Sequence, residues 1–421
     1  MTALAPERAA AAPRGRAPAA VLFVHEGEDW IRGSEQCLLD LVARIDRRRF
    51  RPVVWCNSPV LADAVRALDA PVLVGRGWEG ARARRWPSRA LVGEARRIIG
   101  AHDARLVHAN DVGPVKWLIP AARAARVPLL AHIHHPTTEM ERCLSGLHQA
   151  SRTVAVSHHA LQGFLDDGLS PPRARVVYNG VDAARLNAGS ARGLRAALGV
   201  PADAVVTAFV GSLIPRKAPD VLLRAFAATP GHLVVVGDGP ERPALAALAQ
   251  ALGVAGRVHF LGERGDVGAI LRDASDIFAS PSRSEAFPLT PLEAAAAGLP
   301  VVVSDIAPHR EAVVVGETGL LFPVDDVGAL AAALGRLAAD PALRGALGAA
   351  GRRRVEREFD IGRYVARFEG LYDELLTRPR WRSGWLGDWT WPRVYWRWVA
   401  RAAARRVRRR PAGGAAGAAA P

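Results

Sequence analysis

Short runs of β-branched and other apolar residues alternate along the chain with longer stretches rich in alanine, leucine and arginine. Apolar runs without regular polar positions are typical of parallel strands that helices cover on both faces of a sheet. The first half of the chain contains seven such runs, at Ala20–His25, Val53–Cys56, Pro71–Val74, Arg105–His108, Pro128–Ile133, Arg152–Val156 and Arg175–Tyr178. The second half contains six, at Val205–Gly211, His232–Gly237, Arg257–Leu261, Asp276–Ala279, Val301–Ser304 and Gly319–Phe322.

The pattern pauses between the halves, at the turn signal Asn179-Gly180 and through residues 182–195. Repeated strand–helix units predict an α/β fold, and the pause predicts two doubly wound, Rossmann-like domains joined by one linker. A chain of 421 residues also suits two domains of ordinary size. The predicted divisions are a disordered leader at 1–19, an N-terminal domain at 20–185, a C-terminal domain at 186–357, a helical stretch at 358–376 within a longer one that starts at 352, and a Trp/Arg-rich tail at 377–421.

The net charge of +15 is concentrated at the ends of the chain. Eleven arginines and one aspartate lie between Thr377 and Pro421, and the leader adds three arginines and one glutamate, which leaves about +3 for the body. A general nucleic-acid-binding protein carries its basic residues on the folded surface, so the distribution disfavours that class.

Compartment signals are those of a cytoplasmic protein. No stretch of about 18 uncharged apolar residues predicts a membrane span, and the leader lacks the apolar core of a signal peptide. The cysteines Cys37, Cys56 and Cys143 are odd in number and have no metal-ligand spacing, which favours reduced thiols over a disulfide framework.

The sharpest local motif places two glutamates, Glu285 and Glu293, around a predicted helix start. Pro288 fits in or just before the first turn, where backbone N–H groups lack intrahelical partners, so Glu285 lies in the preceding loop and Glu293 in the helix. The exposed N–H groups near Leu289 and Thr290 form an anion site, because unpaired donors and the helix dipole both favour negative charge. A diphosphate bound there would have one carboxylate towards each of its ends.

A second motif, Arg216-Lys217, follows a strand of the second half, and ligands of open α/β sheets bind at the carboxyl ends of strands. Two adjacent cations there could neutralise a diphosphate leaving group. A third, weaker motif is the glycine-rich turn that begins at Gly237. Each motif also has an ordinary interpretation: the glutamates could cap or solvate a helix, the cations could be a surface pair, and the glycines could form a structural turn.

Two further motifs lie in the first half. Gly33 follows the first strand, where glycine allows backbone to approach a ligand. His132, His134 and His135 end another strand, and His108 ends the strand before it. The three neighbouring histidines suggest zinc, but alternate strand positions without a convergent cysteine disfavour that site. A buried, hydrogen-bonded core histidine is an equally good interpretation of His108.

Together these motifs resemble the retaining glycosyltransferases of family 4, which have the GT-B fold of two Rossmann-like domains facing across a cleft. The resemblance covers roughly residues 20–376. It rests on the Glu-x7-Glu spacing and on four other segments, Pro215-Arg-Lys217, Gly237-Asp-Gly-Pro240, Gly319-Leu-Leu-Phe-Pro323 and Val176-Val-Tyr-Asn-Gly-Val-Asp182. It implies an N-terminal acceptor domain, a C-terminal nucleotide-sugar donor domain and, at 358–376, a helix that returns to the first domain.

The resemblance also implies a role for each matched position. Arg216 and Lys217 would bind the donor diphosphate, Glu285 the hydroxyls of the donor sugar, and Glu293 the ribose. Backbone at Leu289 and Thr290 would hold the phosphates, with Gly237 nearby. His134 would lie beside the sugar at the reaction centre, and Gly33 would close on the donor from the first domain. Departures from the family pattern are Arg32 and Pro288, where glycine is usual, and Asn110, where a second histidine is frequent.

The implied reaction is a front-face displacement with retention, which needs neither a divalent metal nor another cofactor besides the nucleotide-sugar substrate. The acceptor would be a glycan or a lipid-linked glycan, as in the synthesis of cell-surface polysaccharides. Loops of the first domain, such as Trp78–Trp86, would contact it. A sugar-nucleotide epimerase, a phosphorylase and a non-catalytic nucleotide-sugar-binding protein remain as alternatives of the same fold.

The tail is not explained by a donor site. Six of the eleven tryptophans lie between Trp381 and Trp398, interleaved with arginine. Tryptophan prefers membrane interfaces and arginine is attracted to anionic lipid, so we hypothesise peripheral attachment to the inner face of the cell membrane. A protein or polyanion partner, or an extension that is merely disordered or packed, are the alternatives.

Overall fold

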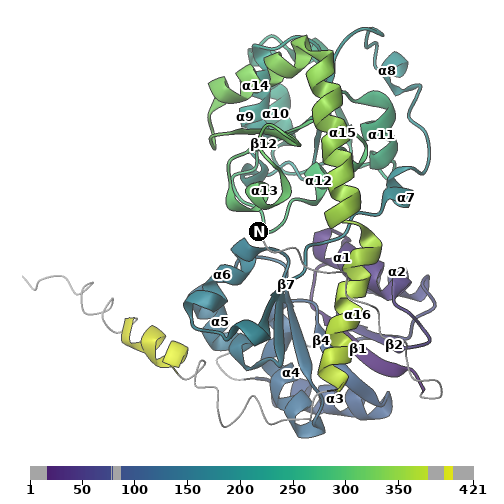
Figure 1. Ribbon diagram of the computed structural model, residues 1–421, viewed down its shortest axis with the longest axis vertical. Coiled ribbons are helices and arrows are strands. Elements are labelled where there is room, and N and C mark those ends of the chain that lie inside the picture. Colours follow the sequence, from purple (N-terminus) through teal and green to yellow (C-terminus); the bar gives the residue numbers. More distant parts are fainter. Residues whose placement is uncertain (1–16, 77, 79–86, 378–392, 402–421) are drawn as a thin grey trace, which may run out of the picture. The chain divides into compact units, whose positions relative to one another are not determined.

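The computed structural model describes residues 17–76, 78, 87–377 and 393–401, and it divides into two compact units (Figure 1). The first unit comprises Met1–His132, Glu139–Thr153 and Glu369–Pro421, and the second comprises Ile133–Thr138 and Val154–Phe368. Most of the predicted leader, the loop from 79 to 86 and most of the tail lie outside the described residues. The predicted division between domains at residue 185 stays a prediction.

The first sheet has the strand order β3-β2-β1-β4-β5-β6-β7, and the strand pairs from β3 to β5 in that order are parallel. The strands are β1 (Ala19–His25), β2 (Phe50–Cys56), β3 (Val72–Val74), β4 (Ala104–Ala109), β5 (Leu129–Ile133), β6 (Arg152–Ala155) and β7 (Ala174–Val176). β7 and the end of β6 are counted with the second unit.

The second sheet has the order β10-β9-β8-β11-β12-β13 and is parallel throughout. Its strands are β8 (Val206–Val210), β9 (His232–Val236), β10 (Val258–Gly262), β11 (Ile277–Ser280), β12 (Val301–Ser304) and β13 (Gly319–Phe322). In both sheets the chain winds outward from a central strand, returns and winds the other way, which is the doubly wound order. The α/β prediction of two such sheets is confirmed.

Helices connect the strands of each sheet. In the first part of the chain they are α1 (Gly33–Arg44), α2 (Pro59–Arg66), α3 (Arg89–Ala101), α4 (Val112–Ala125), α5 (Glu139–Ser145), α6 (His158–Asp166), α7 (Ala183–Leu186) and α8 (Leu194–Ala197). In the second part they are α9 (Pro219–Ala227), α10 (Arg242–Ala251), α11 (Val267–Ala274), α12 (Leu289–Ala296), α13 (Ala307–Ala312), α14 (Val327–Ala339), α15 (Pro341–Glu358) and α16 (Ile361–Thr377).

The second sheet is covered on both faces, which explains why its strands are apolar without alternation. Helices α9, α10 and α14 pack together on one side, α11 and α12 lie on the other, and α15 packs against both α12 and α14 (Figure 1). One core cluster includes Phe209 and Phe226 on the α9 side, and a second includes Val234 and Ile270 on the α11 side. Strands buried on both faces are expected to be continuous apolar runs.

Polar side chains set several helix starts. Ser58, Ser88 and Ser157 accept hydrogen bonds from backbone N–H groups of the first turns of α2, α3 and α6. Asp326 and Asp340 cap α14 and α15 in the same way. Such caps satisfy donors that the helix itself leaves without partners, so the chain enters each helix at a defined residue.

The predicted helical stretch at 352–376 is two helices instead of one. α15 begins earlier, at Pro341, and ends at Glu358, and α16 begins at Ile361. Asp360 explains the break, because its Oδ1 accepts a hydrogen bond of 3.1 Å from the backbone N–H of Arg363 and so starts a new helix.

The last turns of α16 belong to the first unit, where they pack on its sheet. Arg49 Nη1 lies 2.7 Å from Glu369 Oε2, and the buried Arg152 lies 2.7 Å from Glu374. Residues 393–401 form a further helix of this unit, and Arg401 Nη1 lies 2.9 Å from Glu139 of α5. Among the helices that the structure describes, none is long and apolar enough to cross a membrane.

Candidate functional site

The second sheet has a switch point between β8 and β11, where the direction of winding reverses. Loops that leave neighbouring strands at such a point diverge, and ligands of open α/β sheets bind in the crevice at the carboxyl ends. The loop after β8 contains the 3-10 turn η3 (Pro215–Lys217), and the loop after β11 leads into α12. Arg216, Lys217 and Glu285 therefore lie on the two loops that flank the switch point.

Glu285 is a buried carboxylate held by both cations. Its Oε1 accepts hydrogen bonds from Lys217 Nζ at 2.5 Å and Ser282 Oγ at 2.7 Å, and its Oε2 accepts one from Arg216 Nη1 at 3.1 Å. Burial alone would raise the pKa of Glu285, but the Lys217 ammonium, the Ser282 hydroxyl and the Arg216 guanidinium lower it below its ordinary value. Glu285 is therefore ionised at neutral pH, and the three charged side chains together carry one net positive charge.

The two cations differ in exposure. The side chain of Lys217 is 18% exposed, whereas that of Arg216 is 48% exposed. Arg216 Nη1 also donates to the backbone carbonyl of Ser284 at 2.8 Å. A guanidinium has five N–H donors, so Arg216 can keep these bonds and still present donors to an incoming anion. Lys217 is the fixed charge of the pair and Arg216 the accessible one.

Arg283 joins the two loops, and the sequence analysis missed it. Its backbone N–H donates to the carbonyl of Arg216 at 2.8 Å, and its Nη1 donates to the carbonyl of Pro215. Its Nε donates to Asp325 at 2.7 Å, which orients the guanidinium. The only sequence signal was its place inside the Ser-Arg-Ser-Glu segment, where one more arginine in an arginine-rich chain carries little information.

Glycine is required where the loops after β8 and β9 meet. Gly237 has φ +125°, and a Cβ there would lie 2.1 Å from the carbonyl oxygen of Gly211. A Cβ at Gly239 would lie 2.5 Å from the carbonyl oxygen of Leu213. The glycine turn thus lets the β9 loop support the backbone of the β8 loop that carries Arg216 and Lys217. Whether Gly237 also contacts a ligand stays a prediction.

Helix α12 begins as the sequence predicted. Pro288 is its N-cap residue, Leu289 and Thr290 are its first two residues, and Glu293 lies within it while Glu285 precedes it. Pro288 provides no side-chain cap, so its side chain does not occupy the first-turn amides. Glu293 Oε1 lies 3.9 Å from Arg185 Nη2. The predicted contacts of Leu289, Thr290 and Glu293 with a nucleotide stay predictions.

The first unit has its own switch point, between β1 and β4. There His25 Nε2 lies 2.8 Å from Glu35 Oε1, and both side chains are buried. Burial would raise the pKa of Glu35, but the hydrogen bond and charge of His25 lower it to about 2. Glu35 Oε2 also accepts the backbone N–H of Arg32 at 3.1 Å, which fixes the start of α1 beside Gly33.

Gly33 is exposed at the first position of α1, and His134 is half-buried just after β5. Their predicted roles, at the donor and at the reaction centre, stay predictions. His108 is a core residue, because it is fully buried and its Nδ1 lies 2.6 Å from the hydroxyl of Tyr372. Within the described part of the chain, no group of three or more His, Cys, Asp or Glu could hold a metal ion.

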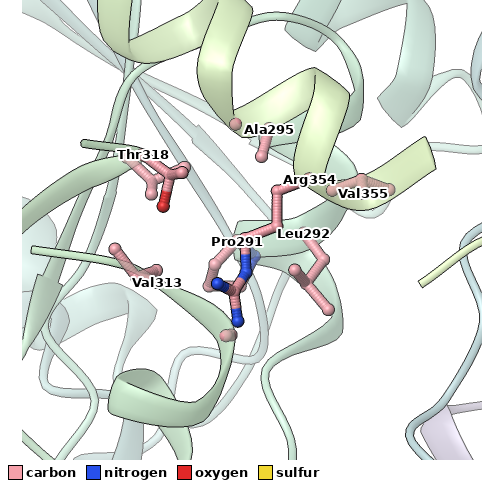
Figure 2. A pocket seen from close by; sticks show the side chains of 10 residues that line it. Pro291, Leu292, Ala295, Val313, Thr318, Arg354 and Val355 are labelled. Atoms are coloured by element: carbon pink, nitrogen blue, oxygen red, sulfur yellow. The ribbon is translucent and has the colours of Figure 1, made fainter. Parts of the chain in front are cut away.

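A small cavity lies against α12 away from the charged cluster. Pro291, Leu292 and Ala295 line it together with Thr318 and Arg354 (Figure 2). Its volume of about 10 Å³ is room for a single water molecule. The cavity is too small for a nucleotide sugar, so it belongs to the packing between α12 and α15.

Known proteins match both halves of the chain. The family model described as Glycosyltransferase Family 4 matches residues 31–185, and the one described as Glycosyl transferases group 1 matches residues 192–354. The D-inositol 3-phosphate glycosyltransferase of Saccharomonospora viridis is 43% identical over 50% of this chain and 52% of its own length. That of Mycobacterium tuberculosis is 42% identical over 40% of this chain and 37% of its own length. The chain thus matches about half or less of the length of these relatives.

Solved structures share the fold over most of the chain. HepE from Anabaena, solved in complex with UDP-glucose, has a TM-score of 0.73 at 24% identity and covers 84% of this chain and 99% of its own. A glycosyltransferase from Rickettsia africae has a TM-score of 0.77 at 17% identity and covers 86% of this chain and 100% of its own. With its two doubly wound sheets and the matches to both family models, the chain belongs to the family 4 type of glycosyltransferases with the GT-B fold.

Proposed function

We propose that this chain transfers a glycosyl group from a nucleoside diphosphate sugar to a glycan or lipid-linked acceptor, with retention of configuration and without a metal ion. One observation carries the proposal: a buried, ionised glutamate lies between Arg216 and Lys217 at the switch point of the second sheet. The cluster has a net positive charge, and its Glu285 lies on the loop that enters α12, whose first-turn N–H groups also favour an anion.

In the proposed reaction, the bond from the anomeric carbon to the diphosphate oxygen breaks as the acceptor oxygen bonds to that carbon from the same face. The acceptor proton passes to an oxygen of the departing diphosphate. Negative charge grows on the leaving group, so the accessible Arg216 and the fixed Lys217 stabilise the transition state. Glu285, already ionised, accepts hydrogen bonds from hydroxyls of the donor sugar. The chemistry requires no protein nucleophile.

The relatives support this class of reaction. HepE was solved with UDP and with UDP-glucose, and the curated relatives are named as glycosyltransferases. Their names do not extend to the acceptor of this chain, for which we propose a nascent or lipid-linked cell-surface polysaccharide. An epimerase would interconvert nucleotide sugars without releasing the nucleoside diphosphate, and a binding protein would show affinity without turnover.

A panel of uridine, guanosine and adenosine diphosphate sugars tests the proposal. Thermal shift should select one nucleotide, and slow hydrolysis of the matching donor should release the nucleoside diphosphate. Retention is checked by NMR of the first-formed anomer, and metal independence by unchanged rates in EDTA. Arg216→Ala should reduce turnover by 100-fold or more, about the effect of removing one charge-stabilising donor. Arg264→Ala, which removes an exposed arginine paired with Asp266, is the matched control.

Loss of activity in both variants, or none in either, would contradict the assigned role of Arg216. Release of no nucleoside diphosphate from any donor, with a new nucleotide sugar formed instead, would establish the epimerase. Tight binding of a nucleotide sugar without turnover on any acceptor would establish a binding protein.

We also propose that the tail attaches the enzyme to the inner face of the cell membrane. Trp396, in the helix at 393–401, is 67% exposed, and the tail carries most of the net charge. Exposed tryptophan and arginine favour an anionic lipid surface. Co-sedimentation with phosphatidylglycerol vesicles should exceed that with phosphatidylcholine vesicles, and Trp396→Ala should reduce it. Equal sedimentation with both lipids would remove this part of the proposal.

A further inference from the structure

A chain of buried polar contacts runs from Glu285 into the second sheet. Ser282, Ser304 and His309 are each fully buried, although serine is mostly exposed in proteins and histidine is intermediate. Ser282 follows β11, Ser304 ends β12 and His309 lies in α13, so these contacts connect two neighbouring strands of the sheet with the helix that follows β12. The motifs recognised in the sequence include none of these three residues.

Each link of this chain is a hydrogen bond to a neighbouring residue. Ser282 Oγ donates to Glu285 Oε1 at 2.7 Å, and Ser304 Oγ donates to the backbone carbonyl of Ser282. His309 Nδ1 lies 2.7 Å from the backbone carbonyl of Ser304. Two of the links end on backbone carbonyls, which cannot relay a proton. These hydrogen bonds therefore have a structural role. They hold the loop after β11 in the position in which Glu285 contacts Lys217.

The carbonyl of Ser304 can only accept, so Nδ1 of His309 carries the proton. Burial lowers the pKa of His309, against the opposing effects of the Ser304 carbonyl and of Glu285, and the imidazole is neutral at neutral pH. Its Nε2 is buried and has no hydrogen-bond partner among the described residues. A buried polar atom without a partner is costly, and the hydrogen bond from Nδ1 offsets part of that cost, so the Nδ1 donor is the part of this side chain that the structure uses.

We propose that His309 is a positioning residue for Glu285. Through Ser304 and Ser282 it fixes the loop that carries the carboxylate, and so it sets the register between Glu285 and the hydroxyls of the donor sugar. This inference rests on the proposed function. It concerns binding of the sugar more than binding of the diphosphate, because the series of contacts ends on the Glu285 carboxylate, whereas Arg216 and Lys217 lie on the other loop, in η3.

Two substitutions of similar size separate the two nitrogens of His309. In His309→Asn the side-chain amide nitrogen can occupy the place of Nδ1 and keep the bond to Ser304. In His309→Gln the amide reaches the place of Nε2, and the Nδ1 donor is lost. Ser304→Ala removes the hydroxyl that bonds to the Ser282 carbonyl and that also lies 3.3 Å from His309 Nδ1, with a smaller change in volume. His232→Gln, at the opposite end of the sheet at the start of β9, is the matched control.

The measured quantity is the affinity for the selected sugar nucleotide relative to that for its nucleoside diphosphate without the sugar. We expect His309→Gln and Ser304→Ala to weaken binding of the sugar nucleotide about tenfold, the size of one lost hydrogen bond to a charged group, with the diphosphate affinity unchanged. His309→Asn and His232→Gln should keep the wild-type ratio. A general structural defect would instead weaken both ligands together.

The inference is overturned if His309→Gln and Ser304→Ala keep the wild-type ratio, or if they weaken the two ligands equally. If His309→Gln does not fold, Ser304→Ala alone decides the matter. The proposed function fails separately, when the wild-type protein binds no sugar nucleotide of the panel and releases no diphosphate. In that case this inference fails as well. If the wild type is active and the variants keep the wild-type ratio of sugar-nucleotide to diphosphate affinity, only this inference is wrong.

Discussion

Replacing Lys217 with methionine tests the charge balance around Glu285 through stability, independently of any substrate. Methionine keeps most of the length and apolar volume of the lysine side chain but removes the ammonium that lies against Glu285 Oε1. Removing one partner of a buried ion pair leaves an uncompensated charge, which typically costs about 3–5 kcal/mol. Arg216 and Ser282 still contact the carboxylate, so we expect a smaller loss, about 2 kcal/mol.

For a unit of this size, a loss of about 2 kcal/mol lowers the midpoint of thermal unfolding by about 4–8 °C. The double variant Lys217→Met/Glu285→Gln should recover at least half of it, because the neutral amide no longer needs a counter-charge. Differential scanning calorimetry of the wild type, both single variants and the double variant completes the cycle.

The pH dependence gives the sign of the effect. In the wild type, ionised Glu285 has a lowered pKa, so its contribution to stability is present above the ordinary pKa of 4.5 and is lost as the pH falls below it. In Lys217→Met, burial remains without its main compensation, so the pKa of Glu285 rises and protonation stabilises the variant. The gap in unfolding midpoint between wild type and variant should therefore narrow from pH 8 to pH 5. A gap that stays constant or widens would refute the reasoning.

Three further predictions concern stability. Gly237→Ala places a Cβ 2.1 Å from a carbonyl oxygen of the β8 loop, at a residue with φ +125°. It should lower the free energy of unfolding by about 2–4 kcal/mol and abolish the nucleotide-dependent thermal shift. Gly256→Ala, which has open space around its Cβ, should do neither. In α15, Gly345→Ala should raise the unfolding free energy by about 0.5–1 kcal/mol in urea titration, because alanine favours helix and nothing lies within 4 Å. Gly348→Ala in the same helix should lower it, since its Cβ would lie 2.0 Å from a carbonyl after α12, and equal effects at the two sites would contradict the packing. Ionised Glu35 contributes on the order of 3 kcal/mol to stability, and this contribution is lost as the pH falls from 4.5 towards 2. Glu35→Gln should therefore reduce the fall in the unfolding midpoint over this pH range. If the midpoint of the variant falls as steeply as that of the wild type, His25 does not lower the pKa of Glu35.

Most of the strands could be predicted because their signal is local. A strand buried on both faces needs an unbroken apolar run, and each such run is a strand of the structure, as at Val301–Ser304 and Gly319–Phe322. The meeting of Arg216, Lys217 and Glu285 could also be predicted, since loops at the carboxyl ends of neighbouring parallel strands share one edge of the sheet. That prediction needed only the positions of the strands in the sequence and the direction in which they run.

Features that depend on long-range partners could not be predicted. The break between α15 and α16 depends on Asp360 and also on the distant Val181, whose backbone N–H donates to the carbonyl of Phe359 and whose carbonyl accepts the N–H of Ile361. Arg283 acts on Pro215 and on the backbone of Arg216, which are 68 and 67 positions away in the chain. The contact of Ser304 with Ser282 joins the end of β12 to the loop after β11 through one hydroxyl, and no local sequence pattern predicts it.

At Arg32 and Pro288, where the family usually has glycine, the backbone is not strained. Arg32 has φ −126° as the N-cap of α1, and Pro288 has φ −87° as the N-cap of α12, both of which are allowed for residues with a side chain. Gly237, by contrast, combines a positive φ with a close approach of another backbone, so only glycine fits. Glycine is thus required at the β9 loop, where one backbone supports another, and is replaceable at the two helix starts. Substituting Arg32 or Pro288 with glycine would add conformational freedom to the unfolded chain and should destabilise the protein slightly, whereas no residue other than glycine should restore a variant at position 237.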